Sequence, residues 1–249
     1  MKKVAYFFVV LLSCISVLGS TGCGQPQFTI KQDTLTVGAE LDVPWLMEKG
    51  TSYEGFGFDV LKHVADELGL EIQFVPTAIS TRLTDMNEDR YDVLGAPVVI
   101  TADRKEQMDI TVPVASTSFK LVVFRQSPLK GQEDLEGMLA GAVESSKALK
   151  LAQAIPGIRD VKVFPHDDEM YAALRDGTVD VIVSPSAEYT WRNRQEEAYT
   201  SIGEVGETTE WGFGVKKGNT ELLSRLNQTL GRMKEDGSLA KLQEKWLGE

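Results

Sequence analysis

The chain has 249 residues and a formal net charge of −11, with 37 acidic against 26 basic residues. No basic stripe interrupts this acidity, so nucleic acid and anionic lipid surfaces are not the expected partners. Its two histidines and two cysteines form no metal-ligand cluster and no nucleophile–base pair, so neither a metal nor another cofactor is expected.

The amino-terminal segment has the pattern of a secretory signal. Two lysines follow Met1, an apolar run extends from Val4 to Leu18, and small residues come next. The sequence around Cys23 resembles a bacterial lipoprotein cleavage site, although Ser20 stands where an aliphatic residue is usual. Two alternatives stay open, namely cleavage before Cys14 and an ordinary cleaved signal with an incidental cysteine.

Cleavage before Cys23 would leave a mature chain with a single thiol and therefore with no internal disulfide. Roughly 225 residues would then build their core by burial alone. We expect residues 1–22 to be the signal and Cys23 to be lipidated, since several acyl chains give stable anchoring. Residues 23–31 would form a tether that holds the protein outside the cytoplasm, at the periplasm or the outer face of the cell membrane.

The first third of the folded part alternates strands with helices. We expect these elements in the following order: strand 34–38, a helix from Phe58 to Gly69, strand 71–76, a short helix around Leu83 and Met86, and a strand at 91–94. Strands that alternate with helices predict a parallel sheet with crossover connections.

A second cycle of strands and helices follows. It comprises strand 119–124, strand 141–143, a helix opened by Ser145-Ser146, strand 161–164, a helix capped by Asp167 that ends at Gly177, strand 179–183, strand 210–215, and two terminal helices around 222–233 and 238–246. No linker rich in proline and glycine separates the cycles, which favours two lobes joined by short β crossovers.

Motifs along almost the whole mature chain resemble the bacterial extracellular solute-binding proteins of family 3, the amino-acid-binding components of ABC importers. The residues that carry the resemblance are Gly57-Phe58-Asp59-Val60, Glu67-Leu68-Gly69, Tyr91-Asp92-Val93, Ile100-Thr101-Ala102-Asp103-Arg104, Asp176-Gly177-Thr178-Val179-Asp180 and Trp211-Gly212-Phe213-Gly214-Val215 through Lys245-Trp246-Leu247-Gly248.

The resemblance implies a two-lobed α/β fold of the periplasmic-binding-protein type II. Lobe one would hold residues 32–116 and 209–249, and lobe two residues 117–208, with two β crossovers and a ligand cleft between them. A monomer that closes on a small ligand would be recognised by a membrane permease.

By resemblance, the ligand carboxylate would lie in a pocket built from both lobes. Arg104 would grip it through its planar fork, and the backbone amide of Val99 would assist. Ser145 and Ser146 would complete the pocket at a helix start, while Lys147 is either a further contact or a solvated charge.

The usual partner of a ligand ammonium is missing from this sequence. Related amino-acid binders have an aspartate after the strand that ends at Val183, whereas this chain has Ser184. Either another acid replaces it or the ligand is not a standard α-amino acid. Glu40 is the leading substitute, and Glu188 and Glu210 are weaker ones. Trp45 and Ile79 are expected to form apolar walls of the cleft.

Three functions fit these residues. The leading one is a lipid-anchored substrate-binding protein of an ABC importer, which is not an enzyme and binds a polar amino acid or a related organic acid. The second is a cyclohexadienyl or arogenate dehydratase on the same fold, with Glu144 as the proton donor. The third is a sensor that presents its closed form to a membrane receptor in trans.

Overall fold

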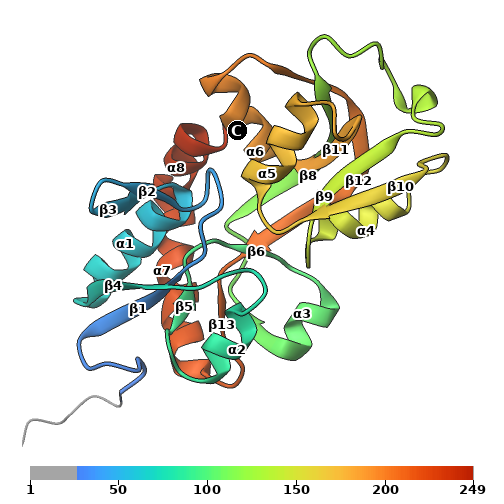
Figure 1. The fold of residues 1–249 in the computed structure, drawn as a ribbon. Coiled ribbons are helices and arrows are strands. Elements are labelled where there is room, and N and C mark those ends of the chain that lie inside the picture. The colour runs from blue at the N-terminus through green and yellow to red at the C-terminus, as the bar shows by residue number, and fades with distance from the viewer. Residues whose placement is uncertain (1–26, 249) are drawn as a thin grey trace, which may run out of the picture.

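The computed structural model describes residues 27–248, which form two α/β lobes (Figure 1). The predicted signal and Cys23 lie outside these residues. Within residues 27–248, each helix is too short or too polar to cross a bilayer. The last residues of the predicted tether lie against the first lobe, where the backbone N–H of Ile30 donates to Asp92 at 2.7 Å.

The first lobe is built on a five-stranded sheet with the order β4-β1-β5-β13-β7. Its strands are β1 (Thr34–Ala39), β4 (Glu71–Pro76), β5 (Val93–Leu94), β7 (Met108–Ile110) and β13 (Gly214–Lys216). Strand β1 pairs in parallel with β4 and β5, while β13 runs antiparallel to β5 and β7. The helices of this lobe are α1 (Phe56–Leu68), α2 (Arg82–Asn87), α3 (Ala102–Gln107), α7 (Thr220–Glu235) and α8 (Ser238–Trp246).

The second lobe is built on a six-stranded sheet with the order β10-β9-β11-β8-β12-β6. The strands of this sheet are β8 (Ala115–Phe124), β9 (Leu139–Val143), β10 (Asp160–Phe164), β11 (Val181–Pro185), β12 (Tyr199–Gly212) and, at its edge, β6 (Val98–Val99), which belongs to the first lobe. The helices packed on it are α4 (Lys147–Gln153), α5 (Asp167–Arg175) and α6 (Ser186–Gln195).

Two long neighbouring strands connect the lobes. Strands β8 and β12 pair antiparallel, and Thr117 lies opposite Thr209 in the ladder. The register shifts between Val205 and Thr209, close to that pair. At its far end β12 also pairs with β6, so one strand carries hydrogen bonds from the second sheet back to the first lobe.

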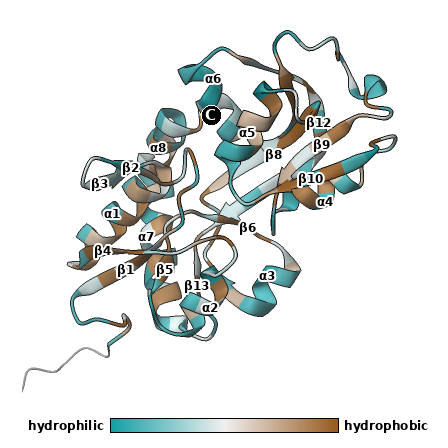
Figure 2. Ribbon diagram, viewed as in Figure 1, coloured by the Kyte–Doolittle hydropathy of each residue, from teal (hydrophilic) through white to brown (hydrophobic). Residues whose placement is uncertain are grey.

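The apolar residues gather on the strands and on the inner faces of the helices (Figure 2). Val60, Leu61 and Val64 on α1 are fully buried at the spacing of one helical face. Gly57 lets α1 begin close to the loop after β5, because a β-carbon at Gly57 would lie 2.0 Å from the carbonyl oxygen of Gly95. The absence of a side chain at Gly57 thus lets helix α1 pack closely against the loop after β5.

The predicted helices are present, and the predicted strand 210–215 is divided between the end of β12 and β13. The elements that we did not predict are the hairpin of β2 (Met47–Lys49) and β3 (Ser52–Glu54), the short strands β6 and β7, helices α3 and α6, and a 3-10 turn at Gln132–Asp134. Asp167 is not the cap of α5: His166 occupies that position without a side-chain cap bond, and Asp167 is the first helical residue. Its carboxylate is therefore free to face the space between the lobes.

Candidate functional site: a cavity between the lobes

A cavity of about 650 Å³ lies between the two lobes. Side chains from both lobes line it, and its charged members are Glu40, Asp42, Glu48, Arg82, Arg104, Lys147, Asp167, Asp168, Glu169, Glu188 and Arg192. A volume of this size suits a small solute whose surface is mostly buried.

Arg104 lies on α3 and projects into the cavity from the first lobe. The hydroxyl of Thr101 accepts a hydrogen bond from the Arg104 backbone N–H and caps the helix. The guanidinium donates to the carbonyl oxygen of Val99 at 3.0 Å and to that of Ser145, in the second lobe, at 3.5 Å. Burial, and next to it the charge of Arg82, lower the Arg104 pKa to about 10, which leaves the group charged at neutral pH.

Glu40 follows β1 and is already paired. Arg82 on α2 donates to both of its carboxylate oxygens, at 3.0 and 3.2 Å. Both side chains are buried, so each compensates the charge of the other. Glu40 lines the cavity, as the ligand-contact prediction requires, but it does so as half of an ion pair.

Acidic groups from both lobes face each other across the cavity. Asp42 comes from the loop after β1, whereas Asp167 and Glu188 come from α5 and α6. Burial, together with the charges of Asp167 and Glu188, raises the pKa of Asp42 well above its usual range. Burial also raises the pKa of Asp167 and of Glu188. The charge of Arg192 opposes all three pKa shifts but does not offset the effect of burial.

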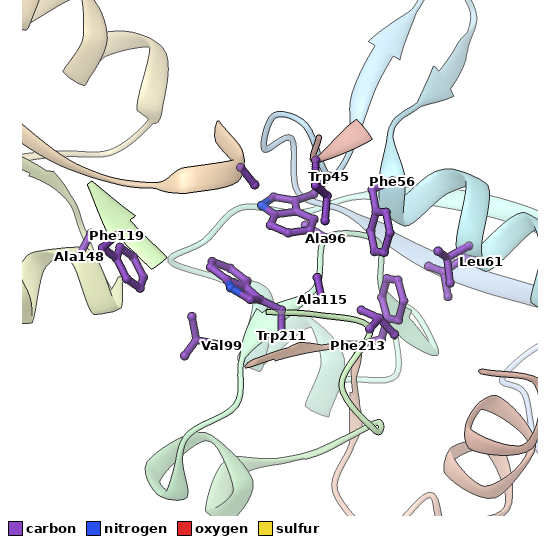
Figure 3. Close-up of a cluster of buried hydrophobic side chains, with 14 of the residues drawn as sticks. Trp45, Phe56, Leu61, Ala96, Val99, Ala115, Phe119, Ala148, Trp211 and Phe213 are labelled. Carbon is purple, nitrogen blue, oxygen red and sulfur yellow. The ribbon is translucent and has the colours of Figure 1, made fainter. Parts of the chain in front are cut away.

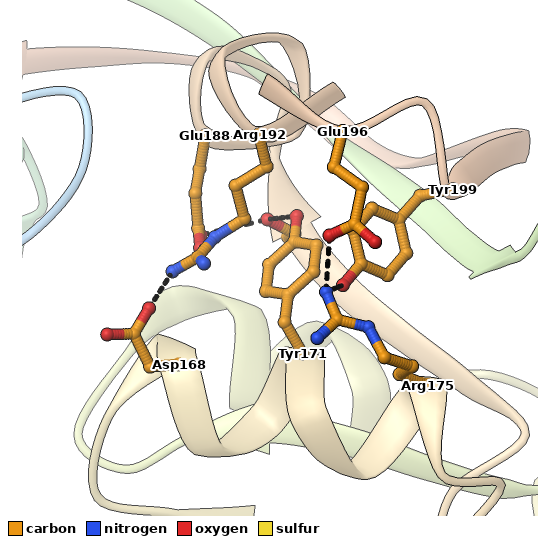
Figure 4. Close-up of polar contacts among 8 residues, drawn as sticks. Asp168, Tyr171, Arg175, Glu188, Arg192, Glu196 and Tyr199 are labelled. Atoms are coloured by element: carbon orange, nitrogen blue, oxygen red, sulfur yellow. Dashed lines mark hydrogen bonds and ion pairs between the residues drawn. The ribbon is translucent and has the colours of Figure 1, made fainter. Parts of the chain in front are cut away.

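Arg192 organises the acidic side of the second lobe (Figure 4). It donates through Nε to Glu188 and through Nη2 to Asp168, each at 2.8 Å, and its guanidinium lies over the Tyr171 ring at 4.3 Å. Ser184 is fully buried behind these groups, where its hydroxyl accepts from Tyr171 and donates to Glu188, each at 2.9 Å. Ser184 does not line the cavity; it supports Glu188, which does.

The apolar walls come from Trp211, Phe119, Ile79 and Val99. Trp45 lies behind this wall and is fully buried (Figure 3). Its ring stacks on Trp211 at 5.1 Å between centroids. Of the two tryptophans, Trp211 lines the cavity, whereas Trp45, the expected wall residue, packs behind it.

The Ser145-Ser146 turn lies beside Arg104, but its hydroxyls are not the groups that meet it. Ser146 lines the cavity and caps α4, accepting from the backbone N–H of Leu149 and donating to the carbonyl of Val143. Ser145 adopts φ 54°, a left-handed conformation that turns its carbonyl towards Arg104. Lys147 also lines the cavity and donates to the hydroxyl of Thr209 at 2.5 Å.

Two candidate acids lie away from the cavity, and acids that we did not propose as ligand contacts line it. Glu144 and Glu210 are absent from the lining, whereas Asp42 and Asp167 belong to it. The position of Asp42, two residues beyond Glu40 at the end of the first strand, was the only available signal for it. Asp167 was assigned to a helix cap, a role that its sequence position also fits.

No group of three acidic, histidine or cysteine side chains within residues 27–248 is arranged to hold a metal ion. The acidic side chains instead line a cavity that the guanidinium of Arg104 also lines. This arrangement can bind a molecule that carries both signs of charge.

In a comparison with known protein families, residues 35–249 match the bacterial extracellular solute-binding proteins, family 3. The L-cystine-binding protein TcyJ of Escherichia coli is 28% identical over 246 residues, which cover 96% of this chain and 92% of TcyJ.

Solved structures share the two-lobed fold. An ancestral arginine-binding protein bound to arginine is 30% identical with a TM-score of 0.78, covering 86% of this chain and 98% of that one. An ancestral amino-acid-binding protein described as a precursor of cyclohexadienyl dehydratase is 26% identical with a TM-score of 0.78, covering 86% and 95%.

Proposed function

Because this chain belongs to the bacterial extracellular solute-binding proteins, family 3, we propose that it is the substrate-binding component of an ABC importer for a carboxylate-bearing amino acid. The ligand would occupy the cavity between the lobes. Relatives named for the binding of cystine and of arginine support an amino acid over other organic acids.

The observation that carries this proposal is the placement of Arg104. Its guanidinium faces the cavity, forms no ion pair within residues 27–248 and uses its hydrogen bonds on two carbonyl oxygens. A carboxylate would supply the charge that this buried cation lacks and match its fork with two parallel bonds. The backbone of Val99 and the turn at Ser145-Ser146 would surround that carboxylate.

The cavity also offers a reason why this chain lacks an acid after its β11 strand. Glu40 lines the cavity and can replace that acid as the acceptor of a ligand ammonium, because a carboxylate accepts more hydrogen bonds than the two that Arg82 donates. The presence of Ser184 in place of an aspartate is therefore compatible with an amino-acid ligand.

We propose that the moving bodies are residues 32–116 with 209–249, and residues 117–208. Strands β8 and β12 would act as the hinge, since they are the connections between the two sheets. Ligand contacts available from both lobes at once would favour the closed form, which a permease then recognises.

We further propose that Cys23 is lipidated and anchors the mature chain outside the cytoplasm. The experiment is metabolic labelling with a fatty-acid analogue and membrane fractionation of the full chain and of a Cys23→Ser variant. Label and membrane association that persist in the variant would contradict the anchor.

The ligand is identified by a thermal-shift screen of the purified chain with amino acids, organic acids and amines, followed by calorimetry. Ligand binding to the folded state raises its stability, by about 2.7 kcal/mol at a hundredfold excess over Kd. Stabilisation by amino acids supports the proposal. Stabilisation by amines that lack a carboxylate, and by no amino acid, would refute it.

A dehydratase activity is a second candidate, favoured by one observation. The carboxyls of Asp42 and Asp167 face the same cavity as Arg104, and burial raises the pKa of each, as a general acid requires. Glu144, the donor expected from the sequence, does not reach this cavity. An assay with prephenate and arogenate decides between the candidates, because turnover would contradict a purely transporting role.

A further inference from the structure

Most of the buried charges around the cavity are already compensated. Arg82 is paired with Glu40, and Arg192 is paired with Glu188 and with Asp168. Within these pairs, each charge is compensated by a group of the protein.

Among the other charged residues that line the cavity, Glu48 and Glu169 are exposed, and Lys147 donates to the hydroxyl of Thr209. Arg104, Asp42 and Asp167 remain. Arg104 bonds to carbonyl oxygens, and neither Asp42 nor Asp167 forms an ion pair within residues 27–248. Both aspartates are half-buried, so water screens their charges only in part. The cavity thus presents one guanidinium and two carboxyls that form no ion pair within residues 27–248, with the charge of Arg192 acting on both carboxyls.

The guanidinium and the carboxyls come from different elements around the cavity. Arg104 bonds to the carbonyl oxygens of Val99 and Ser145, whereas Asp42 and Asp167 come from the loop after β1 and the start of α5. Neither aspartate is among the charges that act on the Arg104 pKa, which are those of Arg82 and Glu40. A ligand that contacts both Arg104 and the two aspartates must carry its negative and positive groups some distance apart.

We propose that Asp42 and Asp167 bind a cationic side chain of the ligand, and that the preferred ligand is a dibasic amino acid. This inference rests on the proposed function, since it assigns the ligand α-carboxylate to Arg104. The α-ammonium would lie near Glu40, whose carboxylate accepts more hydrogen bonds than the two from Arg82. The cavity of about 650 Å³ has room for the extended side chain.

The placement of the two aspartates on opposite lobes gives this cation a second effect. Asp42 belongs to the first lobe and Asp167 to the second, so their charges repel one another when the lobes approach. A guanidinium or alkylammonium between them would replace this repulsion with attraction. A neutral side chain of equal size would leave the two carboxyls facing each other.

The test is calorimetry of the mature chain at pH 7 with L-arginine and with L-citrulline, which has nearly the same shape but no side-chain charge. We expect arginine to bind at least about tenfold more tightly, the gain of one charge-assisted contact. Asp42→Asn and Asp167→Asn should shrink this ratio towards one, while Glu197→Gln on the outer surface should preserve it. The thermal stability of each ligand-free variant checks that it folds.

Two results would overturn the inference while leaving the proposed function intact: citrulline or another neutral amino acid binding as tightly as arginine, or a ratio unchanged in both aspartate variants. If the chain binds no amino acid at all, the proposed function fails together with the inference.

Discussion

Arg82 donates through Nη1 to both carboxylate oxygens of Glu40, at 3.0 and 3.2 Å, and the two side chains are only 9% and 10% exposed. Removing one partner would leave a buried charge without compensation. We expect Arg82→Met to lower the free energy of unfolding by about 3–5 kcal/mol, measured by urea denaturation at pH 7.

The matched control for this pair is Lys49→Met. Lys49 pairs with Glu54 at 2.5 Å, but it is 69% exposed, so its loss should lower the free energy of unfolding far less than Arg82→Met does. The double variant Arg82→Met with Glu40→Gln should recover much of the lost stability. Equal costs for the buried and the surface pair would contradict the compensation that we assign to Arg82.

We expect substitutions of Arg104 to change the affinity for the ligand more than the stability of the fold. Arg104→Ala should weaken binding of the ligand found in the screen by about 10- to 150-fold, which corresponds to ~1.5–3 kcal/mol for a charged hydrogen bond. Arg104→Lys should restore only part of this, because an ammonium keeps the charge but loses the planar fork. Arg225→Ala, on the outer face of α7, is the control and should leave Kd unchanged. Unaltered affinity in Arg104→Ala would exclude the carboxylate site.

The carboxyl of Asp42 gives the protein a measurable pH dependence. Burial and the charges of Asp167, Glu188 and Glu40 raise its pKa, while Arg192 opposes them. The folded state thus holds a proton more tightly than the unfolded state, so this group's contribution to stability falls as pH rises through its folded pKa. Asp42→Asn should therefore raise the melting temperature at pH 7.

The difference in melting temperature between Asp42→Asn and the parent chain should vanish at a pH of about 3.5, where the carboxyl is largely protonated even in the unfolded chain. Calorimetric melting of both proteins between these pH values measures it. A variant that is less stable than the parent at pH 7 would contradict the repulsion inferred among these acids. Acidification should also weaken the binding of a cationic ligand.

Trp45 and Trp211 stack on each other, but only Trp211 of the two lines the cavity. Trp45 is fully buried beneath the cavity, and its indole N–H finds no hydrogen-bond partner among residues 27–248. Trp45→Phe keeps an aromatic ring and removes that unsatisfied donor, so Kd should change less than about twofold. Trp211→Ala should weaken binding by more than about tenfold through loss of the cavity wall. Calorimetry decides, and a larger loss from Trp45→Phe would place Trp45 in direct contact.

Hydrophobic periodicity sufficed for the main elements of both sheets. The apolar face of α1 and the alternation in β4 are local patterns, and the structure places both where we predicted them. The full length of β12 was not predictable in this way, because its exposed residues between Ser201 and Thr209 show no apolar alternation. Its pairing with β8, which is distant in the sequence, determines that strand.

The charged end of the cavity was the least predictable part. Asp167 at the start of a helix has the same local sequence signature whether it caps the helix or faces a ligand. Asp42 comes near it only because the two lobes meet. Arg104, by contrast, was recognisable because its neighbours form a contiguous motif.

The pairing of Thr117 with Thr209 has a mechanical consequence. With the lobe bounds proposed above, the chain leaves the first lobe and returns to it at this one pair of the β8–β12 ladder. The residues between Thr117 and Thr209 therefore form a loop that this pair closes. Force applied at the two ends of the chain would load the first lobe and bypass the second until that pair separates. Pulled in a single-molecule instrument, the protein should lengthen in two separate steps, the later one releasing the stretch between Thr117 and Thr209.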